Sequence, residues 1–198
     1  MPSTIDTDVY RPAPAGVGPR SDVLTLGWTG SHTSVRYLEA LRPALTDLAR
    51  KTRLRLRVVG ARFACDGVEI EELPWRAESE VADLLPIDVG LMPLPDEEWV
   101  KGKCSFKALQ YMALAIPVVL SPVGMNVEVV ADGGNGLFAT TSAEWMEKIS
   151  RLAAKSELRK RLGEAGRQTV EARYSARAQA PRVAAVLRRA AARPDSGP

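Results

Sequence analysis

The sequence predicts an α/β protein built on a doubly wound parallel sheet, with helices on both faces and a helical extension at the C-terminal end. Two observations lead to this fold class. Short apolar segments typical of buried strands alternate with longer segments whose apolar residues recur at helical spacing, a pattern typical of parallel sheets. In addition, 198 residues with 45% hydrophobic and 26% charged side chains can bury the core that such a sheet needs.

The first elements are expected to be a strand and an amphipathic helix. A short buried strand is predicted at Val23–Leu26, followed by a turn of small residues at Gly27–Ser31. The apolar stripe of the helix consists of Leu38, Leu41, Leu45 and Leu48. Pro43 lies within this stripe and predicts a kink or a restart. Further strands are expected at 54–60, 68–73 and 87–91, with a short helix at 78–85.

The second half begins with the same alternation and ends in helices. A helix at 105–115 is followed by a strand at 117–120. Three helical segments then follow, at 142–154, 157–173 and 176–192, each opened by a serine in an N-cap-like position (Ser142, Ser156 and Ser175). Residues 1–21 have the proline and glycine content of a linker. We therefore expect an interdomain linker at 1–21, a sheet domain at 22–175 and a final helix and tail at 176–198.

Charge, hydropathy and cysteine content exclude several classes of protein. A net charge of +3 is too small for counterion release to dominate binding, so no nucleic-acid partner is expected. No apolar stretch approaches the roughly 20 residues that span a bilayer. The first 20 residues lack an apolar signal segment, and Cys65 and Cys104 form no metal-binding spacing. We expect a cytoplasmic protein with reduced thiols and no metal site.

Charged residues are distributed unevenly along the chain. Between Val68 and Glu98 there are ten acidic residues and one basic residue, whereas the segment from Arg151 onward is basic. Solvated helix faces explain both runs. The alternative is a contact with an acidic partner or with an anionic membrane surface, which would place the protein at the inner face of the membrane.

Ligands of open α/β sheets bind outside the carboxyl ends of the strands, so the loops that lead from strand to helix are candidate sites. In the first loop, Gly30 and Ser31 allow a close approach of an anion, and a tight turn without a ligand is the alternative. Trp75 follows a strand end and could stack on a planar base, although a core or rim position is the alternative. His32 is the one histidine of the sequence, and Cys104 has no CxxC partner, so both are poor candidates for catalysis.

The loop before the helix at 105–115 carries the strongest signal. It places Lys103 and Ser105 at a helix N-terminus, where the macrodipole and the free amides favour phosphate. Lys103 and Lys107 lie four positions apart, so they share a face if the helix begins by Lys103. Two neighbouring lysines repel unless an anion lies between them, and a pair of solvated surface lysines is the alternative.

Several motifs occur together and in a fixed order. They are Ile5–Pro12, Lys103–Ala113, Pro117–Val119, Ser121–Gly124 with Glu128, Asp132–Leu137 and Leu158–Gly166. This set resembles the C-terminal, nucleotide-sugar-binding domain of retaining GT-B-fold glycosyltransferases of the family 4 type, over almost the whole chain. The resemblance implies a Rossmann-like domain that binds the donor without a cofactor or a metal.

The resemblance also implies an N-terminal domain that this chain lacks and that binds a glycan or lipid-linked acceptor. The chain is then expected to be a piece of a longer enzyme, which binds the donor nucleotide without turnover on its own. The final helix at 176–192 would normally pack on that missing domain.

By position, the resemblance implies a role for each candidate residue. Lys103 and Lys107 would stabilise the leaving phosphate as its charge develops. Gly30 and Ser31 would approach the diphosphate. The rest of the implied donor-binding set comprises the amides of Ser105 and Phe106 at the sugar, Gln110 at the ribose, the segment Leu73–Arg76 with Trp75 at the base, largely through backbone groups, and Glu128.

The chain departs from the family pattern at informative places. The usual acidic pair, with seven residues between its members, falls on Gly102 and Gln110, and the usual arginine and lysine after the first strand fall on Trp28 and Thr33. An amide can still bond to ribose hydroxyls, but the carboxylate on the sugar side is lost. These departures leave open a non-catalytic nucleotide-binding or interaction module. An epimerase half of the same fold would need acids and histidines that the sequence does not offer.

Overall fold

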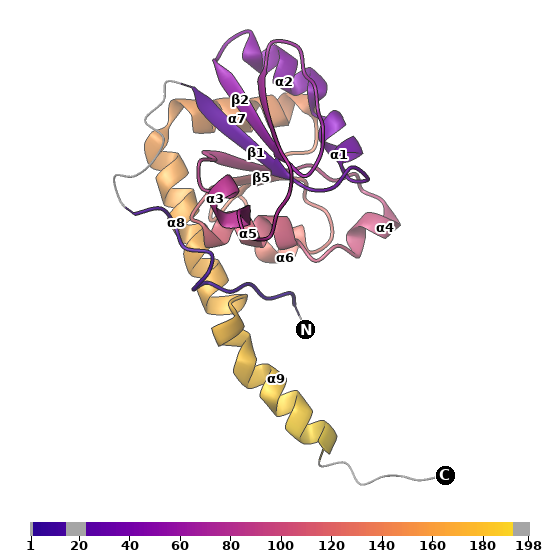
Figure 1. Cartoon of the computed structure of the whole chain (residues 1–198), viewed down its shortest axis with the longest axis vertical. Coiled ribbons are helices and arrows are strands. Elements are labelled where there is room, and N and C mark those ends of the chain that lie inside the picture. The colour runs from indigo at the N-terminus through magenta and orange to yellow at the C-terminus, as the bar shows by residue number, and fades with distance from the viewer. Residues whose placement is uncertain (1, 15–22, 192–198) are drawn as a thin grey trace.

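The computed structural model describes residues 2–14 and 23–191, and these form a six-stranded sheet between two layers of helices (Figure 1). The strands are β1 (Leu24–Thr29), β2 (Leu54–Val59), β3 (Glu69–Leu73), β4 (Val89–Met92), β5 (Val118–Leu120) and β6 (Leu137–Phe138). Their order is β3-β2-β1-β4-β5-β6, and all neighbouring strands are parallel. The predicted doubly wound, Rossmann-like fold is confirmed.

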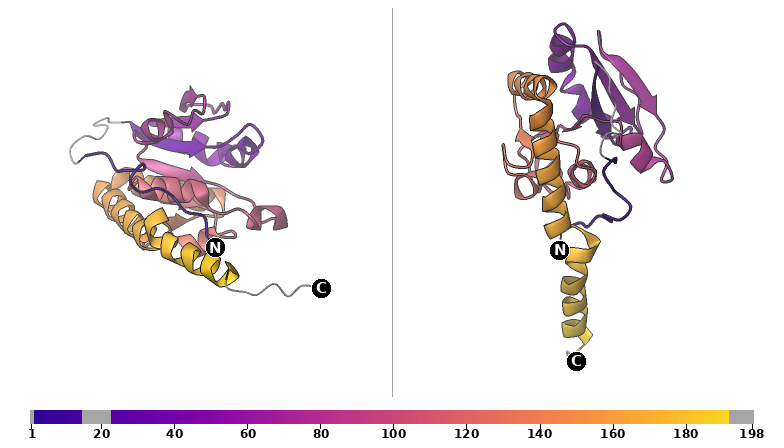
Figure 2. Two further views of the ribbon diagram at one scale, coloured as in Figure 1. Left: turned by 60° about the horizontal axis from the view of Figure 1, so that its bottom comes forward. Right: turned by 90° about the vertical axis from the view of Figure 1, so that its left-hand side faces the viewer.

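Helices cover both faces of the sheet (Figure 2). On one face lie α1 (Val35–Glu39), α2 (Arg42–Ala49) and α7 (Ser142–Ala154); on the other lie α3 (Glu80–Leu84) and α5 (Phe106–Ala113). The long helix α8 (Ser156–Arg173) packs along α5, and α9 (Ala176–Ala191) extends beyond the sheet (Figure 1). Two single-turn helices, α4 (Glu98–Lys101) and α6 (Asn126–Val129), lie in the loops after β4 and β5.

The helical stripe predicted from the leucines is buried as expected. Leu38, Leu45 and Leu48 are fully buried against the sheet. The helix restarts rather than bends, because α1 ends at Glu39 and Pro43 lies in the first turn of α2, where a proline costs no hydrogen bond. At roughly 1.5–3 kcal/mol for each fully buried leucine, this stripe is a main source of stability for its face of the sheet.

The turn predicted at Gly27–Ser31 is wrong in its first three residues, because β1 continues to Thr29. All six residues of β1 are buried and pair with β2, up to Thr29 opposite Val59. Gly27 is compatible with a central strand because the side chain of Ile87 occupies the space of its missing Cβ, with Ile87 Cδ1 only 2.1 Å from that position. The glycine therefore serves packing rather than a turn.

The helix starts differ from the predicted serine caps in two of three cases. Thr141, not Ser142, caps α7: its hydroxyl accepts from the amide of Glu144 (3.2 Å), and the Glu144 carboxylate accepts from the Thr141 amide (3.1 Å). Ser156 is the first residue of α8 rather than its cap. Ser175 does accept from the amide of Ala178 (3.0 Å) at the start of α9.

Part of the acidic run is neutralised within the sheet. Arg55 and Arg57 of β2 pair with Glu69 and Glu71 of β3, each with a shortest N–O distance of 2.9 Å. The register places each pair directly opposite, so the alternating arginines of β2 and the acids of β3 belong to one cross-strand ladder. Within the described part of the chain, no helix combines the length and the hydropathy needed to cross a bilayer.

Candidate functional site

The strand order reverses between β1 and β4, and the crevice outside the carboxyl ends of these two strands is the expected ligand site of such a sheet. The end of β1 leads into Gly30 and Ser31. The end of β4 leads into the loop that carries Lys103 and then into α5. The fold therefore brings the first and second predicted loops to one edge of the sheet, as the sequence indicated.

Lys103 and Lys107 lie close together at this edge of the sheet. The Nζ atom of Lys107 is 5.6 Å from the centroid of the Trp28 ring, and that of Lys103 is 5.5 Å from the centroid of the Tyr37 ring. Burial, and next the positive charge of Lys103, lower the pKa of Lys107. Over the described residues, neither lysine has a carboxylate partner. Two cations without a carboxylate partner among the described residues therefore lie close together here.

The two lysines do not share a helix face in the way their spacing suggested. Helix α5 begins at Phe106, so Lys103 precedes it, and the chain turns sharply at Ser105. Ser105 has φ 57° and ψ 22°, the left-handed conformation that is rare for a residue with a side chain. This turn, rather than helical spacing, brings Lys103 near Lys107.

The side chain of Ser105 holds this turn in place. Its hydroxyl donates to Oδ1 of Asn126, and Nδ2 of Asn126 donates to the carbonyl of Ser121 (2.8 Å). Ser105 as a whole is buried, whereas its neighbour Phe106 is 40% exposed, so Phe106 is the more accessible of the two to a ligand. A strained backbone residue fixed by buried hydrogen bonds is typical of functional sites.

Gly30 is required by packing against Trp28. A Cβ at Gly30 would lie 2.3 Å from Cη2 of Trp28 and 2.7 Å from Oγ of Ser34. The Gly30 amide donates to the carbonyl of Val59 (2.9 Å), and the Ser31 amide donates to Oγ of Ser34 (3.0 Å). Both amides are therefore occupied, and a ligand would meet the Ser31 hydroxyl instead.

Gln110 and Trp75 are joined through two residues that the sequence did not single out. Nε2 of Gln110 donates to the hydroxyl of Tyr10 (3.1 Å), and Nε1 of Trp75 donates to the carboxylate of Glu80 (2.7 Å). The Tyr10 hydroxyl donates to the same carboxylate. Burial, followed by the hydrogen bond with Glu80, raises the pKa of Tyr10 to about 12, so its hydroxyl remains a donor.

Glu128 lies apart from the other candidates. Its backbone carbonyl accepts from the hydroxyl of Tyr174 (3.2 Å), and its exposed side chain borders a cavity of about 480 Å³ beside the α8–α9 junction, together with Arg173 and Arg182. No other predicted site residue lines this cavity. The structure thus groups Gly30, Ser31 and the two lysines but does not bring Glu128 to them.

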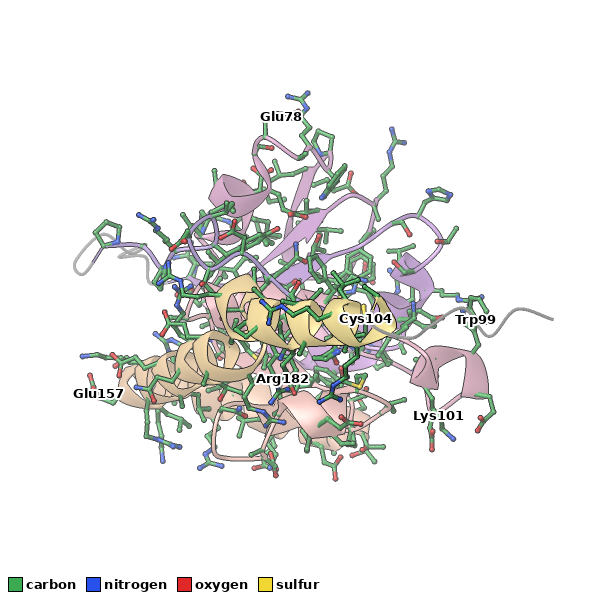
Figure 3. The ribbon with its side chains drawn as sticks, turned by 90° about the horizontal axis from the view of Figure 1, so that it is seen from below. Glu78, Trp99, Lys101, Cys104, Glu157 and Arg182 are labelled. Atoms are coloured by element: carbon green, nitrogen blue, oxygen red, sulfur yellow. The ribbon has the colours of Figure 1, made fainter. Side chains whose placement is uncertain are left out.

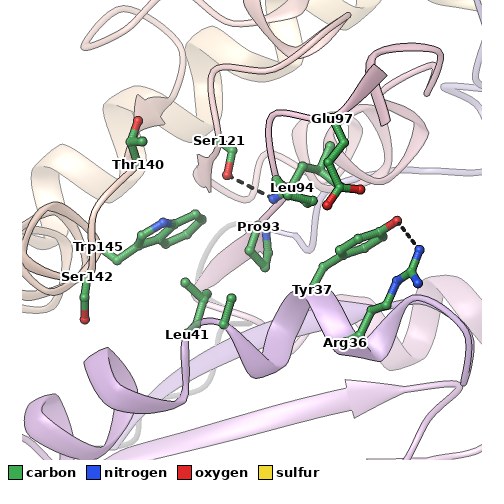
Figure 4. Close-up of a pocket in the computed structure, with 12 residues that line it drawn as sticks. Arg36, Tyr37, Leu41, Pro93, Leu94, Glu97, Ser121, Thr140, Ser142 and Trp145 are labelled. Atoms are coloured by element: carbon green, nitrogen blue, oxygen red, sulfur yellow. Dashed lines mark hydrogen bonds between the residues drawn. The ribbon is translucent and has the colours of Figure 1, made fainter. Parts of the chain in front are cut away.

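Two further cavities lie at the carboxyl edge of the sheet. One, of about 600 Å³, is bordered by His32, Leu73 and Pro74, which includes the start of the segment predicted to contact the base. The other, of about 420 Å³, lies between α1, α2, α7 and the loop after β4, and sequence reasoning missed it (Figure 4). Arg36 and Glu97 are the charged residues of its lining, so the lysine pair offers a diphosphate the greater positive charge.

The four tryptophans divide evenly between core and surface. Trp28 and Trp145 are 2% exposed, whereas Trp75 is 54% and Trp99 is 80% exposed. Trp99 and Lys101 lie on α4 at the outer edge of the molecule, away from α9 (Figure 3). Of the two exposed tryptophans, Trp75 is the one held by a hydrogen bond at the predicted site.

The chain is similar to known proteins in sequence family and in fold. Residues 36–185 match a family model described as glycosyl transferase-like. A comparison with curated protein sequences gives no significant match. Among solved structures, sucrose-phosphate synthase from Thermosynechococcus elongatus is similar at 18% identity and a TM-score of 0.73, with 97% of this chain and 52% of that chain covered.

Two other solved structures extend this comparison. The C-terminal domain of the group 1 glycosyl transferase LpcC from Francisella tularensis shares 19% identity at a TM-score of 0.65, over 87% of this chain and 99% of that domain. HepE from Anabaena, solved with UDP and glucose, shares 17% identity at a TM-score of 0.72, over 93% of this chain and 55% of that one. The chain thus spans about half the length of the first and third proteins, and these similarities establish the fold.

Proposed function

The chain belongs to the glycosyl transferase-like family, and from this premise we propose that it forms the donor-binding part of a glycosyltransferase. The proposed reaction moves a sugar from a nucleoside diphosphate donor to a glycan or lipid-linked acceptor, with retention at the anomeric carbon and without a metal or cofactor. The observation that carries the proposal is the pair of unneutralised lysines, Lys103 and Lys107, which lie over the rings of Tyr37 and Trp28 at the carboxyl edge of the sheet.

The proposed roles follow from the charge that develops when the bond between sugar and diphosphate breaks. Lys103 and Lys107, together with the free amides at the start of α5, would stabilise the departing diphosphate. The Ser105 and Phe106 amides would face the sugar. The base would lie near Leu73 and Trp75, beside the cavity of about 600 Å³, and the ribose near Gln110.

The setting of the reaction is also part of the proposal. Because the chain spans about half the length of sucrose-phosphate synthase and of HepE, we propose that a second unit binds the acceptor and completes the transferase. The 198 residues alone are expected to bind the donor without transferring its sugar. We propose a cytoplasmic enzyme, in contact with the inner face of a membrane where its acceptor is lipid-linked.

Titration calorimetry of the chain with UDP, GDP, ADP and their sugar conjugates tests the proposal. One nucleotide should bind, and Lys103→Ala should weaken it roughly 10- to 100-fold, because a charge-assisted hydrogen bond to phosphate is lost. Lys101→Ala is the matched control, since Lys101 lies two positions away but is already paired with Asp96 and Glu98. Equal affinities for the Lys103 variant and the wild type would exclude the lysine pair as the diphosphate site.

A non-catalytic nucleotide-binding module is the second candidate. It is favoured by Gly102 and Gln110, which stand where the resemblance leads one to expect two acids. Sugar transfer by a protein that contains the acceptor-binding unit would exclude the module. Nucleotide binding without transfer or donor hydrolysis in that protein would favour it.

A further inference from the structure

Four side chains from four separate segments form one hydrogen-bonded chain, which we call the Tyr10–Glu80 network. It runs from Trp75 to Glu80, Tyr10 and Gln110. Each carboxylate oxygen of Glu80 accepts one of these bonds, Oε1 from the Trp75 indole and Oε2 from the Tyr10 hydroxyl. The Tyr10 hydroxyl in turn accepts from Gln110.

The direction of these bonds fixes how Gln110 presents its amide. Because Nε2 donates to Tyr10, the amide cannot rotate freely, and Oε1 is the atom left to accept a hydrogen bond. Across the described residues, Oε1 of Gln110 has no protein donor. An acceptor oxygen held in one orientation, in a network that ends at an exposed indole, suits a nucleoside, which offers sugar hydroxyls and a planar base.

The tyrosine in this network comes from the far end of the chain, 100 residues before Gln110. Its segment is held by Arg167 of α8, whose guanidinium donates to the carbonyls of Tyr10 and Thr7. Ile5 adds two backbone bonds to the α8–α9 junction, one to the Tyr174 carbonyl (3.0 Å) and one from the Ala176 amide (2.9 Å). The Tyr10 hydroxyl is therefore in place only while residues 5–10 are docked.

We propose that Tyr10 and Glu80 are positioning residues for the nucleoside end of the donor site, and that donor affinity depends on the docked N-terminal segment. The inference rests on the proposed function, because it assumes that Gln110 and Trp75 face a nucleotide. It adds two residues to the site and links the site to the helix junction that carries α9. Neither residue is assigned a chemical step.

The test compares Tyr10→Phe with Tyr174→Phe by calorimetry, with the nucleotide that the wild type binds. Both substitutions remove one hydroxyl from a buried ring, but the one partner of the Tyr174 hydroxyl among the described residues, the Glu128 carbonyl, lies outside the network. Tyr10→Phe should weaken binding about 3- to 10-fold, and Tyr174→Phe should leave affinity unchanged. Urea unfolding of both variants shows whether they lose stability equally.

A double-mutant cycle separates positioning from a structural effect. If Tyr10 acts through Gln110, adding Tyr10→Phe to Gln110→Ala should weaken binding no further. Additive losses, or equal affinities for Tyr10→Phe and Tyr174→Phe, would overturn the inference while leaving the proposed function intact. Failure of the wild type to bind any nucleotide would instead reject the proposed function and this inference with it.

Discussion

Nζ of Lys107 lies 5.6 Å from the centroid of the Trp28 ring, and the indole itself is only 2% exposed. An indole face attracts a cation, which offsets part of the cost of burying this ammonium group. The remaining cost lowers the pKa of Lys107, because burial and the charge of Lys103 both disfavour its protonated form. A charge kept at the expense of folding is typical of a ligand site rather than of a structural contact.

Lys107→Met should therefore separate stability from binding. Methionine keeps much of the side-chain length without the buried charge, so the free energy of unfolding should stay the same or rise, while nucleotide affinity should fall at least about tenfold. Urea unfolding and calorimetry measure the two quantities. Lys148→Met is a matched control, since Lys148 is also partly buried but pairs with Glu147 on α7. Unchanged affinity in the Lys107 variant would contradict the assignment.

The lowered pKa of Lys107 also predicts how binding depends on pH. A bound diphosphate favours the protonated lysine, so binding should take up a proton, and affinity should fall as the pH rises through the pKa of the free protein. Calorimetry in two buffers of different ionisation enthalpy detects that proton. Lys107→Arg should remove the alkaline fall, because arginine keeps its charge.

In the free protein, the lowered pKa of Lys107 also determines how the free energy of unfolding changes with pH. The unfolded chain binds the Lys107 proton more tightly than the folded chain, so the free energy of unfolding should rise with pH between the lowered pKa and the ordinary lysine value. An unfolding free energy that falls across this window in the wild type, relative to Lys107→Met, would contradict the shift.

Gly30→Ala should destabilise the protein through Trp28. The new methyl group would lie 2.3 Å from Cη2 of the indole, and overpacking of this kind costs roughly 1–3 kcal/mol. Trp28→Phe removes the ring atoms that the methyl group meets, so the double variant should lose less stability than the sum of the two single variants. Chemical denaturation of the three variants measures this coupling, and strict additivity would show that the methyl group is accommodated elsewhere.

Most of the sheet and its long helices were predictable because burial imposes a period on their sequences. The leucine stripe at 38–48 and the paired patterns of β2 and β3 express that period directly. The single-turn helices α4 and α6 are too short to show one. β1 was predicted too short because Gly27 is typical of a turn, and nothing local shows that Ile87 fills its space.

In the candidate site, the charged residues could be predicted from the sequence, but the contacts between residues far apart in the chain could not. Lys103 and Lys107 were recognisable as a pair before a helix, although the turn at Ser105, and not helical spacing, brings them together. The bond between Gln110 and Tyr10 spans 100 positions, so no local pattern could indicate it. Glu80 lies in a run of ten acids, and nothing in the local sequence distinguishes it from members such as Glu69 and Glu71, which pair with arginines.

The capping of α7 gives a direct comparison of a sequence rule with the structure. Thr141→Ala removes a hydroxyl that accepts from the Glu144 amide, and it should lower the free energy of unfolding by about 1 kcal/mol. Ser142→Ala, at the predicted cap, should change it by less than about 0.5 kcal/mol. Thermal or urea unfolding ranks the two, and the reverse order would restore Ser142 as the cap.

Arg167 joins the N-terminal segment to α5, and its removal should lower the stability of the protein clearly. Its guanidinium donates to the carbonyls of Thr7 (3.0 Å), Tyr10 and Ala113, and it pairs with Glu171 at 2.6 Å. Arg167→Ala leaves these three carbonyls without their donor, so the free energy of unfolding should fall by roughly 2–3 kcal/mol. The free energy of unfolding of Arg167→Lys should lie between those of the wild type and Arg167→Ala, since one ammonium group cannot donate to all the acceptors that the guanidinium reaches.

The matched control for this last prediction is Arg161→Ala on the same helix. Arg161 is exposed and, within the described part of the chain, donates to one carbonyl, that of Gly133 (3.1 Å), so its removal should change stability by less than about 0.5 kcal/mol. Hydrogen exchange adds a local measurement. The Ile5 amide, bonded to the Tyr174 carbonyl, should lose protection in Arg167→Ala but keep it in Arg161→Ala, because Arg167 donates to the docked segment and Arg161 donates to the Gly133 carbonyl instead. Equal protection in both variants would show that Ile5 anchors the segment without the arginine.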